Sequence, residues 1–232
     1  MILGPHRAVL FDLFDTLVRM DTEAYLAGKR EEARLLGAPP EQFIAAWIDS
    51  SDQAQKGELP DFPARVRHAA RACGVDPDET AIACVSGLEE RTAPSLSLYP
   101  DVLPALEGLR RHQGLRIGLV SNASSTAALL VERLGLAERF DHLTFSFRVG
   151  ALKPSPRIYL AACDALDVRP VDCLFVGDGN GYELDGARAL GMEAVRVERP
   201  VVEGPYRKGE SRTFDASVDD LTRVLTLVRP AA

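Results

Sequence analysis

Short apolar runs alternate with helix-like stretches along most of this chain, and that alternation constrains the possible folds more than any other feature. Six segments have the length and composition of strands: residues 8–11, 115–120, 143–147, 173–176, 194–197 and 213–216. Three of them are almost unbroken apolar runs, which is typical of strands covered on both faces. Helical patterns separate them, at residues 103–112, 125–134, 156–166 and 184–190. This order predicts an α/β fold with right-handed βαβ units and a mostly parallel sheet.

Residues 20–93 have a different pattern. They contain four helix-like segments and no convincing strand: residues 23–36, 41–55, 62–73 and 79–91. Glycines and prolines separate these segments, as expected where helices end. We therefore expect an all-helical subdomain at residues 20–93, inserted after the first strand into a core formed by residues 1–19 and 94–232.

The charge balance restricts the partners of the chain. It has 27 Lys and Arg residues and 34 Asp and Glu residues, which give a formal net charge of −7. Such an acidic chain is not expected to bind nucleic acid or an anionic membrane, and no apolar run reaches the roughly 18 residues of a membrane-spanning helix. The four cysteines include no C-x-x-C pair, so we expect reduced thiols and no thiolate zinc site. We expect a soluble, cytoplasmic monomer or homodimer whose partner is a small molecule.

Aspartates follow two of the expected strands. Asp12 ends the first apolar run and Asp178 comes just after the fourth. Open α/β sheets bind ligands at the carboxyl ends of their strands, although an aspartate there can also simply cap a turn. Two such carboxylates side by side would repel each other unless a cation lay between them, and oxygen ligands of this kind suit Mg²⁺. Glu183 adds a further acid nearby, and Gly179 would let the backbone approach an ion or a phosphate closely.

Polar residues follow two further strands. The second expected strand ends in Ser121 and Asn122, whose side chains are able to donate hydrogen bonds to a phosphate. Lys153 follows the third expected strand, just before a helix that begins with proline. It is one of only four lysines in the chain, which favours a role at a phosphoryl oxygen or a carboxylate pair. A solvated loop lysine is the alternative.

These pieces, in this order, resemble the motifs of the haloacid dehalogenase (HAD) superfamily. The matching residues are Asp12 with Thr16, Ser121 with Asn122, Lys153 with Pro154, and Gly177-Asp178 with Glu183. The resemblance covers essentially the whole chain, including a helical cap inserted after the first motif. It implies a Rossmann-like core domain at residues 1–19 and 94–232 and a helical cap domain at residues 20–93.

The resemblance also implies roles for individual residues. Asp12 is the expected nucleophile, which forms a covalent aspartyl intermediate, while Ser121 and Lys153 are expected to hold the transferring group and offset its charge. The implied Mg²⁺ ligands are the side chains of Asp12, Asp178 and Glu183 and the backbone carbonyl of Phe14. The residues expected to contact the substrate are Phe14, Asp15, Thr16, Asn122 and Gly179.

Phe14 is the main departure from the family pattern. Family phosphatases usually carry an aspartate there, which acts as the acid for the leaving group and the base for the hydrolytic water. The dehalogenases of the family place an aromatic residue at this position, but they replace the metal-binding aspartate that this chain keeps as Asp178. Together these two residues favour a Mg²⁺-dependent phosphatase of a small phosphorylated metabolite. Asp15, where glycine is usual, is an alternative acid.

Two other functions stay open. One is a 2-haloacid dehalogenase that uses Asp12 without metal, and the other is a HAD protein that binds a phosphorylated ligand without turnover. The choice of substrate belongs to the cap. Trp47, Arg30, Arg65 and Arg71 are its candidates for facing the site, although covering a helical face is the simpler interpretation of each.

Overall fold

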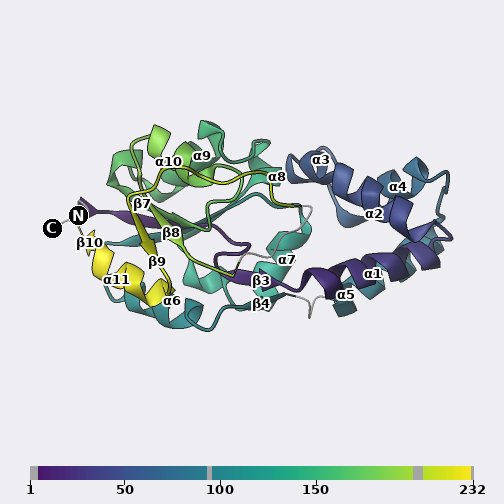
Figure 1. Ribbon diagram of the computed structural model, residues 1–232, viewed down its shortest axis with the longest axis horizontal. Helices are drawn as coiled ribbons and strands as arrows, with labels where there is room; N and C mark the ends of the chain where they lie inside the picture. Colours follow the sequence, from purple (N-terminus) through teal and green to yellow (C-terminus); the bar gives the residue numbers. More distant parts are fainter. Residues whose placement is uncertain (1–4, 93–95, 201–205, 231–232) are drawn as a thin grey trace.

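A six-stranded sheet organises the core of the molecule in the computed structural model, which describes residues 5–92, 96–200 and 206–230 (Figure 1). The strands in spatial order are β6 (His142–Phe145), β5 (Arg116–Ser121), β2 (Ala8–Phe11), β7 (Cys173–Gly177), β8 (Glu193–Val197) and β9 (Ala216–Val218). Every neighbouring pair is parallel, and the first strand of the sheet in the sequence, β2, lies between β5 and β7. The predicted α/β fold with a Rossmann-like parallel sheet is confirmed.

Helices cover both faces of this sheet (Figure 1). On one face pack α6 (Val102–Arg110), α7 (Thr126–Arg133) and α11 (Val224–Leu227), and on the other α9 (Pro156–Leu166) and α10 (Glu183–Ala189). Side chains alternate along β2, so that Val9 and Phe11 join the first layer while Ala8 and Leu10 join the second. All four are fully buried, which explains why this strand is an unbroken apolar run in the sequence.

A second group of helices lies together at the other end of the molecule (Figure 1). These cap helices are α1 (Thr22–Leu35), α2 (Pro40–Asp49), α3 (Ser51–Gln55), α4 (Phe62–Ala72) and α5 (Glu79–Thr92). They pack around a hydrophobic cluster of their own that includes Phe43, Trp47 and Val66. An antiparallel ribbon of β3 (Val18–Met20) and β4 (Leu96–Leu98) connects them to the core. The predicted boundary at residues 93 and 94 lies outside the described residues, and the division into two domains stays a prediction.

The predicted helix over residues 41–55 is in fact two helices, because it breaks at Ser50. At this break the carbonyl of Trp47 accepts hydrogen bonds from Ser50 Oγ at 2.9 Å and from Arg65 Nη2 at 2.7 Å. In a continuous helix the Trp47 carbonyl would accept a hydrogen bond from a backbone N–H of the next turn. Here side chains bind this carbonyl instead.

Two predicted strands are displaced. The strand predicted over residues 143–147 ends at Phe145, where the short helix α8 (Ser146–Val149) begins. The strand predicted over residues 213–216 starts only at Ala216. Thr213 is instead held outside the sheet, since its N–H donates to Asp185 Oδ1 at 3.0 Å.

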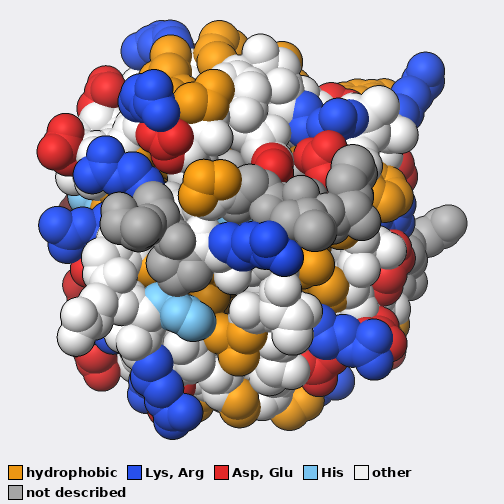
Figure 2. Space-filling view, turned by 90° about the vertical axis from the view of Figure 1, so that its left-hand side faces the viewer, with side chains coloured by type: hydrophobic (Ala, Val, Ile, Leu, Met, Phe, Trp, Pro, Cys, Tyr) orange, Lys and Arg blue, Asp and Glu red, His pale blue; other side chains and the backbone are white. Residues whose placement is uncertain are grey.

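The end of the molecule away from the cap helices is closed by short elements. There β1 (Pro5–His6) pairs with β10 (Arg229–Pro230). Three 3₁₀ helices complete the described elements: η2 (Ala137–Arg139), η3 (Pro170–Asp172) and η4 (Leu221–Arg223). Figure 2 shows basic and acidic side chains interspersed over this end. Among the described helices, none is long and apolar enough to cross a membrane.

Candidate active site

The site lies at the carboxyl edge of the sheet, where its central strands end. Phe11, the last residue of β2, is level with Val176 of β7, and both β5 and β7 run parallel to β2. The N–H of Asp12 still donates to the carbonyl of Val176 at 2.9 Å, which fixes the direction in which the chain leaves the strand. Asp12, Ser121 and Asp178 are thereby brought to one edge, as the sequence predicts.

Three carboxylates gather at this edge. Asp12, Asp178 and Glu183 each offer an oxygen atom within 4.8 Å of the others, and all three residues are buried. Gly177 makes room for this group, because a Cβ atom there would lie 2.1 Å from Glu183 Oε1. Burial, reinforced by the charge of Asp12, raises the pKa of Glu183 well above its usual range. The site thus places three acids close together where each is largely shielded from solvent.

Lys153 supplies the opposite charge. Its Nζ donates hydrogen bonds to Asp12 Oδ1 and to Glu183 Oε2, the latter at 2.6 Å. Burial disfavours the charged form of Lys153, but the two carboxylates outweigh burial and raise its pKa. Burial also raises the pKa of Asp12, with the charge of Lys153 opposing that effect. The predicted nucleophile and the predicted catalytic lysine are therefore in direct contact.

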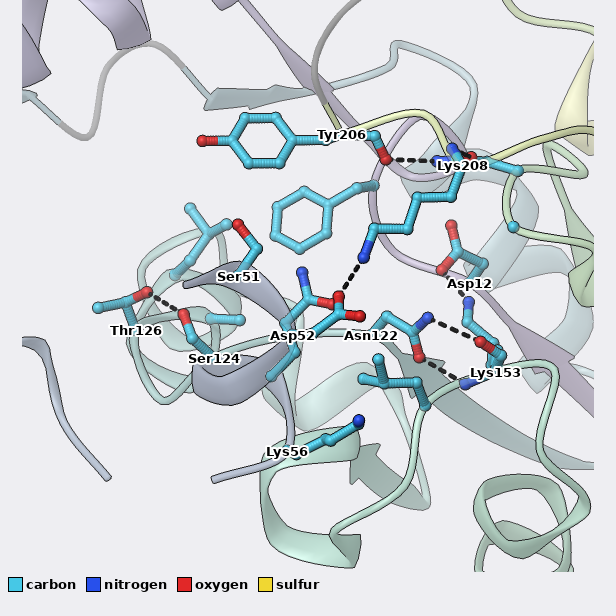
Figure 3. A pocket seen from close by; sticks show the side chains of 18 of the residues that line it. Asp12, Ser51, Asp52, Lys56, Asn122, Ser124, Thr126, Lys153, Tyr206 and Lys208 are labelled. Atoms are coloured by element: carbon cyan, nitrogen blue, oxygen red, sulfur yellow. Dashed lines mark hydrogen bonds and ion pairs between the residues drawn. The ribbon is translucent and has the colours of Figure 1, made fainter. Parts of the chain in front are cut away.

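Asn122 holds the backbone of this lysine. Its Oδ1 accepts from the Lys153 N–H at 2.7 Å, and its Nδ2 donates to the Lys153 carbonyl at 3.2 Å (Figure 3). The two bonds join the end of β5 to the loop after α8. In this arrangement Asn122 orients Lys153. Asn122 also lines the cavity, and its contact with the substrate stays a prediction.

Ser121 and Thr16 are fully buried, and neither side-chain hydroxyl has a hydrogen-bond partner in the described part of the chain. Unpaired buried hydroxyls are uncommon in proteins. Gly179 has a φ of +93° and directs its N–H to Glu183 Oε1 at 3.1 Å. None of these three is among the described residues that line the cavity, and their contacts with a substrate stay predictions.

Phe14 and Asp15 do line the cavity beside Asp12. Asp15 has a φ of +56°, in the left-handed region that favours glycine and tolerates aspartate better than most residues. Burial, followed by the charges of Asp178 and Asp12, raises the pKa of Asp15 to about 6. An acid with a pKa near neutrality therefore stands next to the predicted nucleophile.

Arg207 belongs to the site although sequence reasoning missed it. Its Nη1 donates to Asp178 Oδ2 at 2.9 Å and lies 3.9 Å from Asp15 Oδ2. It also contacts Glu210, which helps to raise its pKa against the effect of burial. The sequence offers no signal for this role, because Arg207 is one arginine among many in a polar loop far from every motif.

A cavity of about 1290 Å³ opens between this edge and the cap helices. Asp12 and Lys153 line it from the core, and Ser51 and Asp52 of α3 line it from the cap (Figure 3). Lys208, from the segment that also carries Arg207, pairs with Asp52 across it. The volume exceeds the roughly 300–1,000 Å³ usual for small-molecule sites.

The candidate specificity residues of the cap separate into two pairs. Trp47 and Arg65 line the cavity, so both stay candidates for facing the substrate, while Trp47 also packs in the hydrophobic cluster of the cap. Arg30 and Arg71 are not among its lining residues. They form exposed ion pairs, Arg30 with Glu41 and Arg71 with Asp76.

Comparison with known proteins agrees with this geometry. A family model described as a haloacid dehalogenase-like hydrolase matches residues 6–191. The glyceraldehyde 3-phosphate phosphatase of Methanopyrus kandleri is 29% identical, over 97% of this chain and 98% of its own length. The (S)-2-haloacid dehalogenase 1 of Pseudomonas sp. strain CBS-3 is 27% identical, over 96% of this chain and 98% of its own length.

The fold comparison points the same way. The crystal structure of a HAD phosphatase from Thermococcus onnurineus is similar with a TM-score of 0.71 and 25% identity, covering 95% of this chain and 96% of that one. Phosphatases and dehalogenases are thus similar to this chain to nearly the same degree, so similarity alone does not choose between the two reactions. What it does establish, together with the match over residues 6–191, is that this chain belongs to the haloacid dehalogenase-like hydrolases and is a hydrolase.

Proposed function

We propose that this protein is a Mg²⁺-dependent phosphatase, which hydrolyses a small phosphorylated metabolite through an aspartyl-phosphate on Asp12. The observation that carries the proposal is the group of three buried carboxylates, whose oxygens lie within 4.8 Å of one another. A dehalogenase that works without metal has no need for Asp178 beside its nucleophile. Phosphoryl transfer, in contrast, needs a cation that offsets the charge of the phosphoryl oxygens.

The residues present fit Mg²⁺. The donor set consists of oxygen atoms, which hard divalent cations prefer, and burial of these carboxylates makes their negative charge costly without a cation. Asp12, Asp178 and Glu183, with the backbone carbonyl of Phe14, would hold the ion. When bound, it would withdraw charge from the phosphoryl oxygens in the transition state.

The chain's own residues then account for the reaction. One carboxylate oxygen of Asp12 attacks phosphorus, and the bond to the leaving oxygen breaks with its electron pair on that oxygen. Lys153 offsets the charge of the transferring group from its place beside Asp12, and Ser121 at the end of β5 would donate to a phosphoryl oxygen. Water then attacks the phosphorus of the aspartyl-phosphate, which releases inorganic phosphate and restores the Asp12 carboxylate.

Asp15 is the proposed proton donor, because Phe14 carries no acid. Asp15 lines the cavity beside Asp12, and burial with the charges of Asp178 and Asp12 raises its pKa to about 6, in the direction that a general acid requires. With a series of aryl phosphates, kcat/KM of the wild type should depend weakly on the pKa of the leaving group, and Asp15→Asn should make that dependence steep. A steep dependence that is the same in both proteins would show that Asp15 donates no proton.

A 2-haloacid dehalogenase is the second candidate, and Phe14 is the observation that favours it. This aromatic side chain packs against the core and lines the same cavity as Asp12. In that reaction Asp12 would attack carbon and displace a halide ion without metal. The similarity to a protein named as a haloacid dehalogenase supports the same reading.

One experiment separates the two candidates. Phosphate release is measured from a panel of phosphorylated metabolites and from p-nitrophenyl phosphate, with Mg²⁺ and with excess EDTA, and halide release is measured from 2-chloropropionate in parallel. We expect phosphate release that requires Mg²⁺. Halide release that persists in EDTA, with no phosphate release from any compound, would establish the dehalogenase instead.

A further inference from the structure

Arg65 is a buried guanidinium group on the cap side of the cavity, outside the carboxylate cluster. The residue lies near the start of α4 and is 7% exposed. Buried arginines are normally neutralised by a carboxylate, because an uncompensated charge in the interior is costly. Arg65 forms no ion pair with any carboxylate among the described residues, and burial lowers its pKa.

The group is nevertheless held rigidly. Nη2 donates to the Trp47 carbonyl at 2.7 Å and to Ser51 Oγ at 3.0 Å, while Nε donates to Ser50 Oγ at 3.2 Å. The guanidinium carbon lies 3.9 Å from the centroid of the Trp47 ring, within the range of a cation–π contact. All of these partners are neutral, so they orient the guanidinium without placing a negative charge against it.

Part of the guanidinium stays available. None of these hydrogen bonds uses Nη1, so its two N–H groups have no hydrogen-bond partner in the described part of the chain. The charges of Glu32 and Glu89 in the cap favour the charged form of Arg65, but both carboxylates accept hydrogen bonds from Lys29 and neither forms an ion pair with Arg65. Since Arg65 lines the cavity, its Nη1 edge is suited to bind an oxyanion there.

Aromatic rings surround this position. Tyr25, Trp47, Phe62 and Tyr206 all line the cavity. Trp47 contacts the Phe62 ring edge-on, and Tyr25 contacts the Tyr206 ring in the same way, at centroid distances of 5.6 Å and 6.1 Å. A ligand that reaches Arg65 from the carboxylate cluster would therefore pass apolar walls, which favours a flat or apolar body over a sugar.

We propose that Arg65 binds a second anionic group of the substrate, a carboxylate or a second phosphate, while the phosphoryl group that is cleaved lies at Asp12. The substrate is then a phosphate ester whose leaving group is itself an anion. This assignment rests on the proposed phosphatase function and adds the chemical class of the leaving group to it.

The test uses pairs of aryl phosphates that differ only in charge. Each pair has a para carboxylate on a chain of no, one, two or three methylene groups, and the corresponding primary amide. For at least one chain length the wild type should prefer the carboxylate in kcat/KM by roughly 10- to 100-fold, mainly through KM. Arg65→Gln should abolish this preference, with the loss of kcat/KM falling mainly on the carboxylates.

Two further variants keep the result interpretable. Arg65→Lys retains the charge without the planar fork, so it should keep part of the preference even if Arg65→Gln folds poorly. Arg67→Gln is the matched control, because Arg67 lies on the same helix, pairs with the exposed Glu79 and is not a cavity residue. It should keep the full preference.

The outcomes also distinguish this proposal from the proposed function. Hydrolysis of the aryl phosphates with equal kcat/KM for carboxylates and amides, or a preference that survives in Arg65→Gln, would overturn the role of Arg65 and leave the phosphatase intact. If no aryl phosphate and no compound of the metabolite panel is hydrolysed, the phosphatase proposal fails. Calorimetric titration with the matching aryl phosphonates then decides about Arg65 by itself: tighter binding of the carboxylates by wild type but not by Arg65→Gln supports it, and equal binding overturns it.

Discussion

Two of the four lysines are buried, and each of them donates to two carboxylates. In the core, Lys153 contacts Asp12 and Glu183. In the cap, Lys29 contacts Glu32 at 2.8 Å and Glu89 at 3.0 Å. As ion pairs the two clusters look alike, yet only the core cluster contains the predicted nucleophile.

The surroundings explain the difference. The ammonium group of Lys29 lies among aromatic rings, 4.2 Å from the centroid of Trp47 and 5.0 Å from that of Phe62, and Lys29 is not a cavity residue. Lys153 lines the cavity, and a third carboxylate, Asp178, joins its two partners. A lysine enclosed by aromatic rings together with its acids stabilises the packing of helices. A lysine that lines a cavity beside three acids is placed to meet charged groups of a ligand.

The largest expected effect compares the carboxylates of the two clusters. Asp12→Asn keeps the shape of the side chain but removes the nucleophile, so kcat/KM should fall by roughly 10⁴-fold or more. Glu32→Gln, the matched change in the cap, should leave kcat/KM little altered. Steady-state hydrolysis of p-nitrophenyl phosphate with Mg²⁺ measures both. Substantial activity of Asp12→Asn would contradict the covalent mechanism.

The lysines themselves give the next comparison. Lys153→Met should lower kcat/KM by about 10²–10³-fold, because a fixed cation beside the transferring phosphoryl group is lost. Lys29→Met should lower the free energy of unfolding by roughly 3–5 kcal/mol, because the buried Glu32 loses its partner, while activity per folded molecule is retained. Denaturant unfolding and kinetics of both variants test this. Equal activities for the two variants would mean that the clusters do not differ in function.

Arg207 contacts Asp178, the third carboxylate of the core cluster, and a change at Arg207 tests what this contact does. If it mainly offsets the charge of Asp178, then Arg207→Gln should lower the Mg²⁺ concentration for half-maximal activity by about 3- to 10-fold, because a competing cation is removed. The KM for the phosphate ester should change less. Arg212→Gln, a change at an exposed arginine of the same loop, serves as control. A raised KM with unchanged Mg²⁺ dependence would instead show that Arg207 binds substrate.

The smallest expected effect is a pH dependence of stability that originates in the cap. Burial raises the pKa of Glu32 to about 8, so the folded protein keeps a proton that the unfolded chain releases near its ordinary pKa. The contribution of this group is fully present at acidic pH and is lost as pH rises towards and through 8. The Tm of wild type should therefore fall relative to that of Glu32→Gln between pH 5 and pH 8 and level off above it. The exposed neighbour Glu31→Gln should show no such trend, and parallel curves for wild type and Glu32→Gln would refute the assignment.

The sequence predicts the arrangement of the site well where each residue is tied to the end of a strand. Asp12 and Asp178 follow apolar runs, and parallel pairing with β2 then brings them to one edge without further information. The position of Lys153 follows less directly from a strand end, because Lys153 lies in a loop whose backbone is held by Asn122. The order of the motifs in the family resemblance is what predicts that Lys153 lies at the site.

Other features arise from contacts between segments that are far apart in the chain. At the break in the helix predicted over residues 41–55, Arg65 of the distant helix α4 donates a hydrogen bond to the Trp47 carbonyl. The same contact places Arg65 on the cavity wall. No local pattern encodes it, because the amphipathic period of α4 is the same whether its arginines face solvent or a cavity.

The sequence by itself therefore determined the parallel sheet, the helical insertion and the acids at the strand ends, because hydrophobic periodicity and strand-end chemistry are local properties. Only the tertiary structure decided which charged side chains meet. Arg207 reaches Asp178 across 29 positions in the chain, and Lys29 reaches Glu89 across 60. Such pairings depend on how loops and helices pack. Burial makes each charge energetically unfavourable, and the packing of the chain determines which opposite charge lies close enough to offset it.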